Sequence, residues 1–583
     1  MSNVREEGEL VTLTSEAGCS PELINDDIRP TALSERTWNV WHIASLWVGM
    51  SVCIPTYMLA SSMITGGLSW KEAISMILLG NLIVAVPMVL NGHAGTRYGI
   101  PFPVLGRAAF GTMGIHIPSI LRALVACGWF GIQTWIGGLA IAAIFGALMG
   151  NAGIAENWWM QFTGFILFWA VQMWLVVKGT ESIKWMETLA APLLILIGIG
   201  MLSWGVSQGG GLGAVLDSSY QFSKPTIVFA PTEDGGASVQ FNLIADEEGK
   251  PRAQQWRYSL GDAPIDDASF QALPEGHRLV LSASELGEAK GLTAQFRAER
   301  EERVIKSAEV TASLAPLQPQ GSTPWMTYFL WLTAMVAFWA TLALNISDIT
   351  RYAASQRDQI RGQFIGLPTT MTLYAFIGVA VTCAAIVIFD DILITQDAPW
   401  DPIRLIARFH DQPVMMIIAQ LAILIATLST NIAANVISPA NSFANLNPQK
   451  ISFRTGGLIT GVIGILIMPW KLMGVIIGFL LTYGAVLGPV VGVLLADYYA
   501  LRGKRLNLEG LYQVDGPYRY QSGFHVNAFI SLGLGVGLVL SGLFIPALKS
   551  LYDVGWFSGF VLSFVTYLVL ARSSVKASRE GEL

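Results

Sequence analysis

Apolar residues along this chain are grouped in long runs that are separated by shorter polar stretches. The runs are about 20 residues long, which is the length of helix needed to cross the hydrocarbon core of a bilayer. We expect about twelve such spans, centred near residues 50, 82, 132, 168, 195, 336, 378, 425, 462, 486, 535 and 562. The pattern therefore predicts an all-α polytopic membrane protein that is surrounded by a lipid bilayer.

Residues 206–322 break this pattern. The segment is rich in Glu, Thr, Ser and Gly, and alternating stretches such as SVQFNLIA and HRLVLSAS are separated by turn signals such as DEEGKP. A disordered loop is the alternative, but the apolar positions Val239, Phe241 and Leu243 favour a folded segment. We expect a small extracytoplasmic β-rich domain that is inserted between spans five and six.

Basic residues gather in the loops on one side of the expected spans. Examples are GTRYGIPFPVLGR and LRGKRLNLEGLY, whereas the opposite side holds FDDILITQDAPWDP. By the positive-inside rule the basic loops are cytoplasmic, and an even number of spans places both termini there. We therefore expect a multi-pass protein of the plasma (inner) membrane with both termini cytoplasmic.

The expected organisation follows from these boundaries. It consists of a cytoplasmic N-terminal tail (1–37), spans one to five (38–205), the insertion (206–322), spans six to ten (323–498), a cytoplasmic loop (499–524), spans eleven and twelve (525–572) and a cytoplasmic tail (573–583). The first tail is acidic and lacks a basic region followed by an apolar one. No cleaved signal peptide is therefore expected.

Composition narrows the possible functions. Hydrophobic residues make up 53% of the chain and charged residues 13%, and the net charge of −6 includes no basic cluster of the kind that binds nucleic acid. The four cysteines lack metal-ligand or redox spacing. The six histidines and the few acids form no catalytic or metal cluster within the spans. We expect neither an enzyme nor a bound cofactor.

Polar and aromatic residues inside the apolar runs mark a candidate site. Trp129 and Gln133, in CGWFGIQTW, are four residues apart and therefore share one face of a helix. Trp129 and Trp339 lie near the centres of their spans, where a tryptophan does not act as an interfacial anchor. A buried unpaired amide costs a few kcal/mol. A flat, amide-rich ligand stacked on an indole is one interpretation, and helix packing is the other.

Two spans carry signs of interrupted helices. Gly49 and Pro55 bracket a piece of span one in which the proline withholds a backbone donor and frees a carbonyl. Unwound backbone at membrane depth is tolerated only where it lines a cavity inside the protein. Span eight places Ser429, Thr430, Asn431 and Asn435 close together in the membrane. Span six has no proline, so a break there is less evident.

Four segments carry a resemblance to a known family. CGWFGIQTW, FWATLALNISDITRYA, STNIAANVISPAN and NGHAGTRYGIPFPVLGRAAFG resemble the nucleobase:cation symporter-1 family, whose members carry hydantoins, allantoin, cytosine, uracil and related heterocycles. The resemblance runs from about Asp26 to the last span and leaves out the insertion. It implies a five-plus-five inverted-repeat core with two further helices, and a substrate site at the midplane beside broken spans one and six.

The resemblance also implies roles for individual residues. The substrate-binding positions of the family match Trp129, Gln133, Trp339 and Asn435. Where the hydantoin-carrying branch has a glutamine in span one, this chain has Cys53. Where that branch has a glycine before the tryptophan of span six, this chain has Phe338. The resemblance therefore implies a pocket that is less polar and tighter on these two sides.

The family's sodium ligands can be matched in the same way. They correspond to the hydroxyls of Ser429 and Thr430 and to the carbonyls of Gly49, Val52 and Ala426. Neutral oxygens suit a hard monovalent cation. A proton is the alternative coupling ion, but it usually needs a titratable group at depth, and Asp348 and Glu187 lie near span ends.

The expected function is import of a small heterocyclic substrate coupled to a cation, with sodium favoured over a proton. The alternative is a transporter-like receptor or sensor that uses the insertion to bind a ligand or partner.

Overall fold

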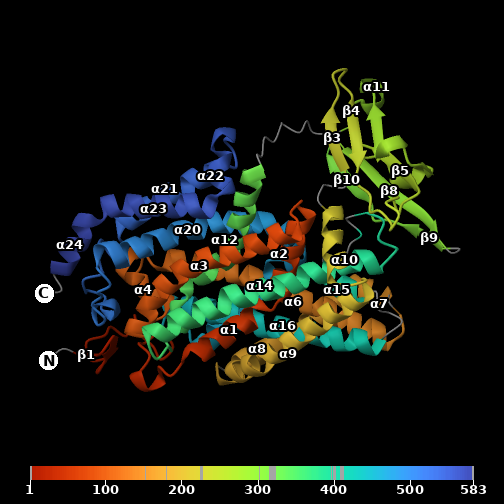
Figure 1. Cartoon of the computed structure of the whole chain (residues 1–583). Helices are drawn as coiled ribbons and strands as arrows, with labels where there is room; N and C mark the ends of the chain where they lie inside the picture. Colours follow the sequence, from red (N-terminus) through yellow and green to blue (C-terminus); the bar gives the residue numbers. More distant parts are fainter. Residues whose placement is uncertain are drawn as a thin grey trace.

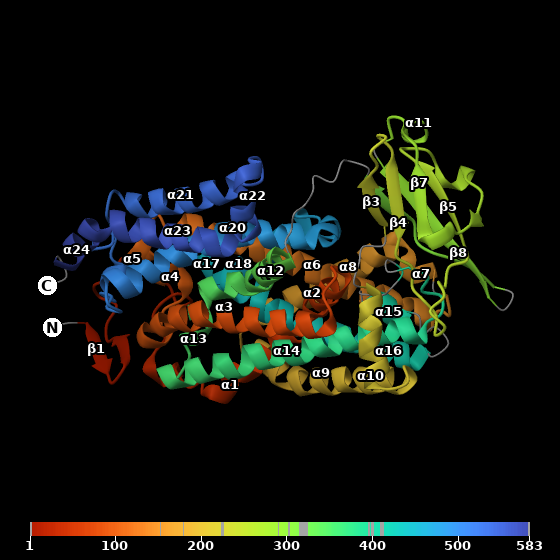
Figure 2. The ribbon, with the colours of Figure 1, turned by 45° about the horizontal axis from the view of Figure 1, so that its top comes forward.

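The computed structural model describes residues 3–151, 153–178, 180–222, 227–289, 291–300, 303–313, 324–394, 397, 402–407 and 413–580. It consists of an elongated bundle of helices and a smaller β-rich part at one end of that bundle (Figure 1). Both chain termini lie at the opposite end, and the turned view in Figure 2 shows the same arrangement.

The first set of long helices corresponds to expected spans one to five. It comprises α1 (Val40–Ser51) with α2 (Ile54–Thr65), α3 (Trp70–Tyr98), α6 (His116–Leu148), α8 (Trp158–Lys178) and α9 (Thr180–Gln208). Shorter helices lie in the connections: α4 (Phe102–Leu105), α5 (Arg107–Phe110), α7 (Gly153–Glu156) and α10 (Leu212–Asp217).

The second set corresponds to spans six to twelve. It comprises α12 (Pro324–Asn345), α14 (Gln356–Ile388), α16 (Pro413–Asn435) with α17 (Ile437–Leu446), α18 (Phe453–Leu466), α20 (Ile476–Leu495), α21 (Val526–Ser541) and α23 (Gly555–Leu570). Shorter helices are α13 (Ser347–Thr350), α15 (Pro402–Ala407), α19 (Pro469–Leu472), α22 (Lys549–Asp553) and α24 (Arg572–Glu580). Each of the twelve expected centres therefore falls within a helix of the structure. Among the described residues, seven helices are by themselves long and apolar enough to cross a membrane, or up to ten if each bent pair is one span.

Helices of the two sets pack against one another rather than side by side as separate bundles. Helix α1 contacts α14 and α16, α3 contacts α12 and α14, and α6 contacts α16. The last two spans, α21 and α23, pack on α20. Residues that are far apart in the sequence therefore meet in the middle of the bundle.

The first span is interrupted at Val52 and Cys53. Helix α1 ends at Ser51, α2 begins at Ile54, and the two helices are bent by 61°. Cys53 has an extended backbone, and Pro55 lies in the first turn of α2, where a backbone N–H has no partner within the helix, so the missing N–H costs no helical hydrogen bond. The break that we expected between Gly49 and Pro55 is present.

The sixth span differs from the expectation. Helix α12 is continuous from Pro324 to Asn345 and includes Trp339, and the helix is interrupted only at Ile346, before α13. The segment between Trp325 and Asn345 contains neither proline nor glycine, so no residue in it favours a break. The resemblance implied a broken span six, and the structure places the interruption at Ile346 and not beside Trp339.

The inserted segment is folded and β-rich, as we expected. Strands β3 (Ile227–Pro231), β4 (Ala237–Phe241) and β7 (Arg278–Leu281) form one antiparallel sheet in the order β3-β4-β7. The second sheet has the order β10-β8-β5-β6, with β9 also paired to β8; its strands are β5 (Gln255–Leu260), β6 (Gln271–Ala272), β8 (Gly291–Arg300), β9 (Arg303–Lys306) and β10 (Val310–Ser313). The alternating residues Val239 and Phe241 of β4 are buried in the hydrophobic core of the β-rich part, which both sheets share.

The β-rich part shares its core with the chain that follows α14. Leu393 and Ile394 are fully buried in the same hydrophobic cluster as the inward-facing residues of the strands. Arg252 donates hydrogen bonds to the carbonyls of Ile386 and Phe389, at 2.6 and 2.7 Å. These carbonyls end α14, so Arg252 caps that helix. The β-rich part is therefore packed onto the bundle and is not held by its two chain connections alone.

Candidate substrate and cation site

Helices α6 and α12 bring three of the candidate aromatic side chains into contact. Trp129 meets Phe338 with ring centroids 5.4 Å apart and an interplanar angle of 71°, and Phe338 lies 5.1 Å from Trp339. Trp339 in turn meets Trp47 of α1 at 5.3 Å. All four side chains are buried. The two candidate indoles are therefore bridged by Phe338 in the middle of the bundle.

Two of the candidate substrate-binding side chains on these helices carry a polar group without a hydrogen-bond partner among the described residues. The two groups are the Oε1 atom of Gln133 and the indole N–H of Trp339, and each side chain is only 3% exposed. Leaving a buried donor or acceptor unpaired costs about 1–3 kcal/mol. Such groups are rare in folded proteins, and a ligand or a water that bonds to them is the usual reason for their presence.

Asn435 and Cys53 lie at the ends of helical segments. Asn435 is the last residue of α16, and its Nδ2 atom donates to the Oδ1 atom of Asn431 at 2.9 Å. Cys53 lies in the break of the first span, and its thiol contacts the hydroxyl of Thr56 at 3.2 Å. Both residues are buried. The closest polar contact of Cys53 is therefore with α2 and not with the aromatic residues.

The five candidate cation ligands come from the break in the first span and from the middle of α16. The hydroxyl of Thr430 donates to the carbonyl of Gly49 at 2.9 Å, and Val52 packs against Ala426. Ser429 is fully buried beside them on α16. Hydroxyl and carbonyl oxygens can both bind a monovalent cation, which would replace the hydrogen bond between them. The residues present therefore fit a sodium site.

A small cavity lies next to this cluster. Its volume is about 40 Å³, and its lining includes Val52, Tyr57, Tyr374 and Ala426 together with residues of α9. A water molecule needs about 10–15 Å³ of such volume. The cavity therefore leaves room beside the candidate ligands for water or a small ion.

Arg122 is a charged residue of the site region that our sequence reasoning missed. It lies two helical turns before Trp129 on α6 and is fully buried. Its Nε atom donates to Asn345 Oδ1 at 2.8 Å and to the Thr341 carbonyl at 3.1 Å, and Nη2 donates to the Ala434 carbonyl at 3.4 Å. Arg122 therefore connects α6, α12 and α16. The signal for it was an ionisable residue within an apolar run.

Tyr483 of α20 is the second residue that we missed. Its hydroxyl accepts a hydrogen bond from the indole N–H of Trp129 at 3.3 Å, and Phe479, one turn earlier on α20, also contacts the Trp129 ring. The two bonded residues are 354 positions apart. No local pattern in the sequence connects them, because the contact depends on how α20 packs against α6.

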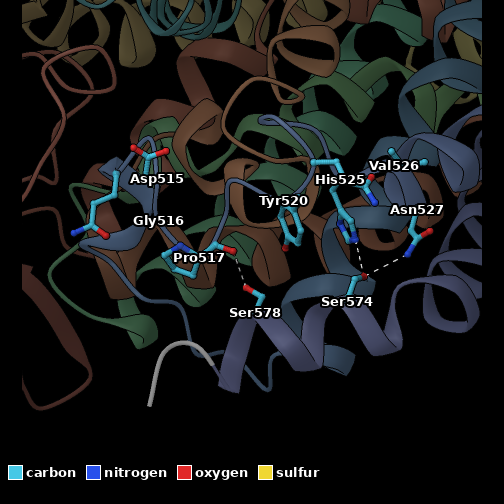
Figure 3. Close-up of a pocket in the computed structure, with 11 residues that line it drawn as sticks. Asp515, Gly516, Pro517, Tyr520, His525, Val526, Asn527, Ser574 and Ser578 are labelled. Carbon is cyan, nitrogen blue, oxygen red and sulfur yellow. Dashed lines mark hydrogen bonds between the residues drawn. The ribbon is translucent and has the colours of Figure 1, made fainter.

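A larger pocket of about 670 Å³ lies near the chain termini, between the loop that follows α20 and helix α24 (Figure 3). The ring of His525 stacks on Tyr520 there and lies 2.8 Å from the Ser574 hydroxyl. Ser578 donates to the carbonyl of Pro517 at 3.0 Å. None of the candidate site residues lines this pocket.

The interrupted first span, the buried aromatic cluster and the interleaved helices belong to a helical membrane protein. Its relatives are permeases, so the class of protein is a membrane transporter and not an enzyme. The family described as permease for cytosine/purines, uracil, thiamine, allantoin matches residues 30–239 and 306–559, and the chain belongs to this family. The residues between the two matched ranges, 240–305, lie in the β-rich part. The resemblance to the nucleobase:cation symporter-1 family is confirmed.

Several curated relatives align with almost the whole chain. The chain is 33% identical to the allantoin permease of Bacillus subtilis over 96% of this chain and 95% of that protein. It is 34% identical to the purine-uracil permease NCS1 of Arabidopsis thaliana, over 97% of this chain and 80% of that protein. It is 25% identical to the hydantoin permease of Microbacterium maritypicum, over 86% of this chain and 81% of that protein.

Solved structures confirm the fold. The chain resembles the nucleobase-cation-symport-1 family transporter Mhp1 in a closed conformation with bromovinylhydantoin bound, with a TM-score of 0.67 and 22% identity over 96% of this chain and 99% of that chain. The inward-facing conformation of Mhp1 gives a TM-score of 0.63. The helical transporter core that we expected is therefore present, with the β-rich insertion as a minor addition.

Proposed function

We propose that the protein is a secondary active symporter that imports a nucleobase or a related heterocyclic amide of the hydantoin, allantoin, cytosine or uracil type by alternating access. The observation that carries the proposal is the pair of unpaired groups on Gln133 and Trp339 within the aromatic cluster. A planar ring with N–H and C=O groups can pair with both and stack on an indole. The permeases that this chain resembles are named for such rings.

Substrate binding in this proposal uses four positions. Trp129 and Trp339 supply aromatic surfaces, and Gln133 and Asn435 supply amide groups. Phe338 lies between the two indoles, so a substrate that stacks on both requires the Phe338 ring to turn aside. Compared with glycine at this position, phenylalanine leaves less space and favours a small ring. Cys53 adds a weakly polar group beside the break of span one.

Coupling in this proposal uses sodium. The hydroxyl of Thr430 on α16 and the carbonyl of Gly49 on α1 are already 2.9 Å apart. A cation that binds both of them holds the broken first span against α16. Of the proposed substrate positions, Asn435 lies on the same α16, and Trp129 and Gln133 lie on α6, which packs against it. An ion bound at this junction therefore favours the arrangement that binds substrate. Neutral oxygen donors favour sodium over a proton.

The orientation in the membrane is part of the same proposal. Both termini lie at one end of the bundle and the β-rich part at the other (Figures 1 and 2). We place the end with the termini in the cytoplasm because the basic loops belong to it. The β-rich part is then extracytoplasmic, and the membrane is the plasma (inner) membrane.

Uptake of radiolabelled allantoin, hydantoin, uracil and cytosine into proteoliposomes, with and without an inward sodium gradient, tests the proposal. We expect at least one of these compounds to accumulate when the gradient is present. Accumulation that follows a pH gradient and ignores sodium would support the proton alternative. Binding of a compound without any transport of it would support the receptor or sensor alternative.

A further inference from the structure

Four buried polar side chains form a hydrogen-bonded chain that ends at Asn435. The other three are Thr134 of α6, Gln172 of α8 and Asn431 of α16, and all three are fully buried. Buried amides are costly unless every group is paired. These three residues belong neither to the substrate positions nor to the cation ligands described above, so their presence needs a separate explanation.

The backbone carbonyl of Phe130 determines the direction of the hydrogen bonds among these four side chains. The Nδ2 atom of Asn431 donates to the carbonyl of Phe130 at 3.0 Å, and a carbonyl can only accept. The Thr134 hydroxyl donates to the same carbonyl, at 2.6 Å, so its oxygen is left to accept from Gln172 Nε2 at 3.0 Å and from Asn431 Nδ2 at 3.2 Å. The Oε1 atom of Gln172 then accepts from Asn431 Nδ2 at 2.6 Å. No amide in this chain can be rotated without losing a bond.

The orientation of the Asn431 amide also fixes the orientation of the Asn435 amide. The Oδ1 atom of Asn431 is its remaining polar atom, and it accepts from the Nδ2 atom of Asn435 at 2.9 Å. A rotated Asn435 side chain would place two carbonyl oxygens against each other and lose this bond. Asn435 is therefore held with its own Oδ1 atom directed away from Asn431. In the described part of the chain this oxygen has no partner of its own, so it is available to a ligand.

We propose that Asn431, supported by Gln172 and Thr134, is a positioning residue that fixes Asn435 as a hydrogen-bond acceptor and so selects heterocycles that present an N–H group to it. The inference rests on the proposed function, because it requires Asn435 to contact the substrate. A ring with a lone pair at that position would face the lone pairs of the Asn435 oxygen, and both groups would stay unpaired.

Two pairs of small rings test the selection. Uracil has an N–H at ring position 3, where cytosine has a nitrogen lone pair. Hydantoin has an N–H at ring position 1, where 2,4-oxazolidinedione has an oxygen. Isothermal titration of the purified full chain gives the affinity for each compound. In the unmodified protein we expect the N–H member of at least one pair to bind on the order of tenfold more tightly than its partner.

Three variants separate positioning from a general effect on the fold. Asn431→Leu removes the acceptor that holds Asn435, so the affinity ratio within the selected pair should fall to about twofold or less. Gln172→Met leaves the bond from Asn431 to the Phe130 carbonyl in place and should lower the ratio by a smaller factor. Thr427→Val is the matched control, because it removes a different buried polar group, a hydroxyl, one turn earlier on α16. It should leave the ratio unchanged.

Each outcome bears on one of the two proposals. If the unmodified protein binds none of the four rings and does not bind allantoin either, the proposed function is wrong and the inference is wrong with it. If it binds allantoin but none of the four rings, the inference alone is wrong. If it binds the rings without preferring the N–H member of either pair, the inference alone is again wrong. A merely structural role predicts that Asn431→Leu weakens all four rings by one common factor, which also contradicts the inference. If Asn431→Leu does not fold, an unchanged ratio in Gln172→Met contradicts it.

Discussion

Gln133 and Asn435 are the side chains on which substrate recognition depends in this account. Each offers an amide group inside the bundle, and Gln133 has an oxygen that is unpaired among the described residues. We expect Gln133→Ala or Asn435→Ala to weaken substrate binding roughly 5- to 150-fold, because each leaves a ligand group unpaired at a cost of about 1–3 kcal/mol. Titration of the two variants measures this. Unchanged affinity in both, with normal expression, would remove these residues from the site.

Trp129 supplies a stacking surface, so its replacements should differ in effect. Stacking of a heterocycle on an aromatic ring contributes about 1–3 kcal/mol, and we expect Trp129→Ala to lower the affinity by roughly tenfold or more. Trp129→Phe keeps a ring and should retain part of the affinity, although it loses the hydrogen bond to Tyr483. Equal losses in the two variants would show that the ring does not stack on the substrate.

For single residues, the sequence predicts which neighbours along the same helix share a face. The four-residue spacing of Trp129 and Gln133 is enough to place them on one face of α6. The partners of these residues are not local: Tyr483 comes from α20, and the amide chain behind Asn435 joins α6, α8 and α16. Such contacts depend on the packing of helices that are distant in the sequence, and no spacing rule predicts them.

At the scale of elements, Thr430 joins α16 to the break in the first span through the Gly49 carbonyl. We expect Thr430→Val to reduce sodium-stimulated substrate binding strongly while sodium-independent binding changes little, because the heterocycle contacts stay in place. Thr430→Ser keeps the hydroxyl and is the matched control, with most of the stimulation retained. Substrate titrations with and without sodium decide the matter. Full stimulation in Thr430→Val would show that this hydroxyl is not a cation ligand.

The β-rich part is joined to the bundle by Arg252, which bonds to carbonyls at the end of α14. We expect Arg252→Met to destabilise the protein by about 2 kcal/mol, the usual value for hydrogen bonds from a charged group. Arg300→Met is the matched control, since the ion pair that Arg300 forms within the described residues is a longer one, at 3.7 Å, with the exposed Asp390. Thermal unfolding of both variants measures the difference. Equal melting temperatures would contradict the capping role of Arg252.

Element types were largely predictable, and the reasons are local. Long apolar runs identify the spans, Pro55 identifies the first break, and the alternation around Val239 and Phe241 identifies the strands. The continuity of α12 was also present in the sequence as the absence of proline and glycine, and only the resemblance argued against it. The packing of Leu393 and Ile394 into the β-rich core was not predictable, because these residues belong to another segment of the chain.

At the scale of the whole molecule, the polar segments before the first span belong to the folded structure. Arg107 is fully buried and donates to the carbonyls of Leu23 and Leu511, at 2.9 Å each. One hydrophobic cluster therefore joins three segments at the end of the bundle that holds both termini: the N-terminal segment, the connection that follows α3 and the loop that follows α20. An even number of spans predicts termini on one side, but it does not predict this packing.

The central claim is that a heterocycle site and a cation site are separate and energetically coupled. The most direct test is to titrate the purified protein with a transported heterocycle over a range of sodium concentrations, and with sodium in the presence and absence of that heterocycle. Thermodynamic linkage requires both experiments to give the same coupling factor, and factors of about 5- to 150-fold are typical. The account predicts equal factors well above one. Factors of one in both titrations, with transport intact, would contradict it.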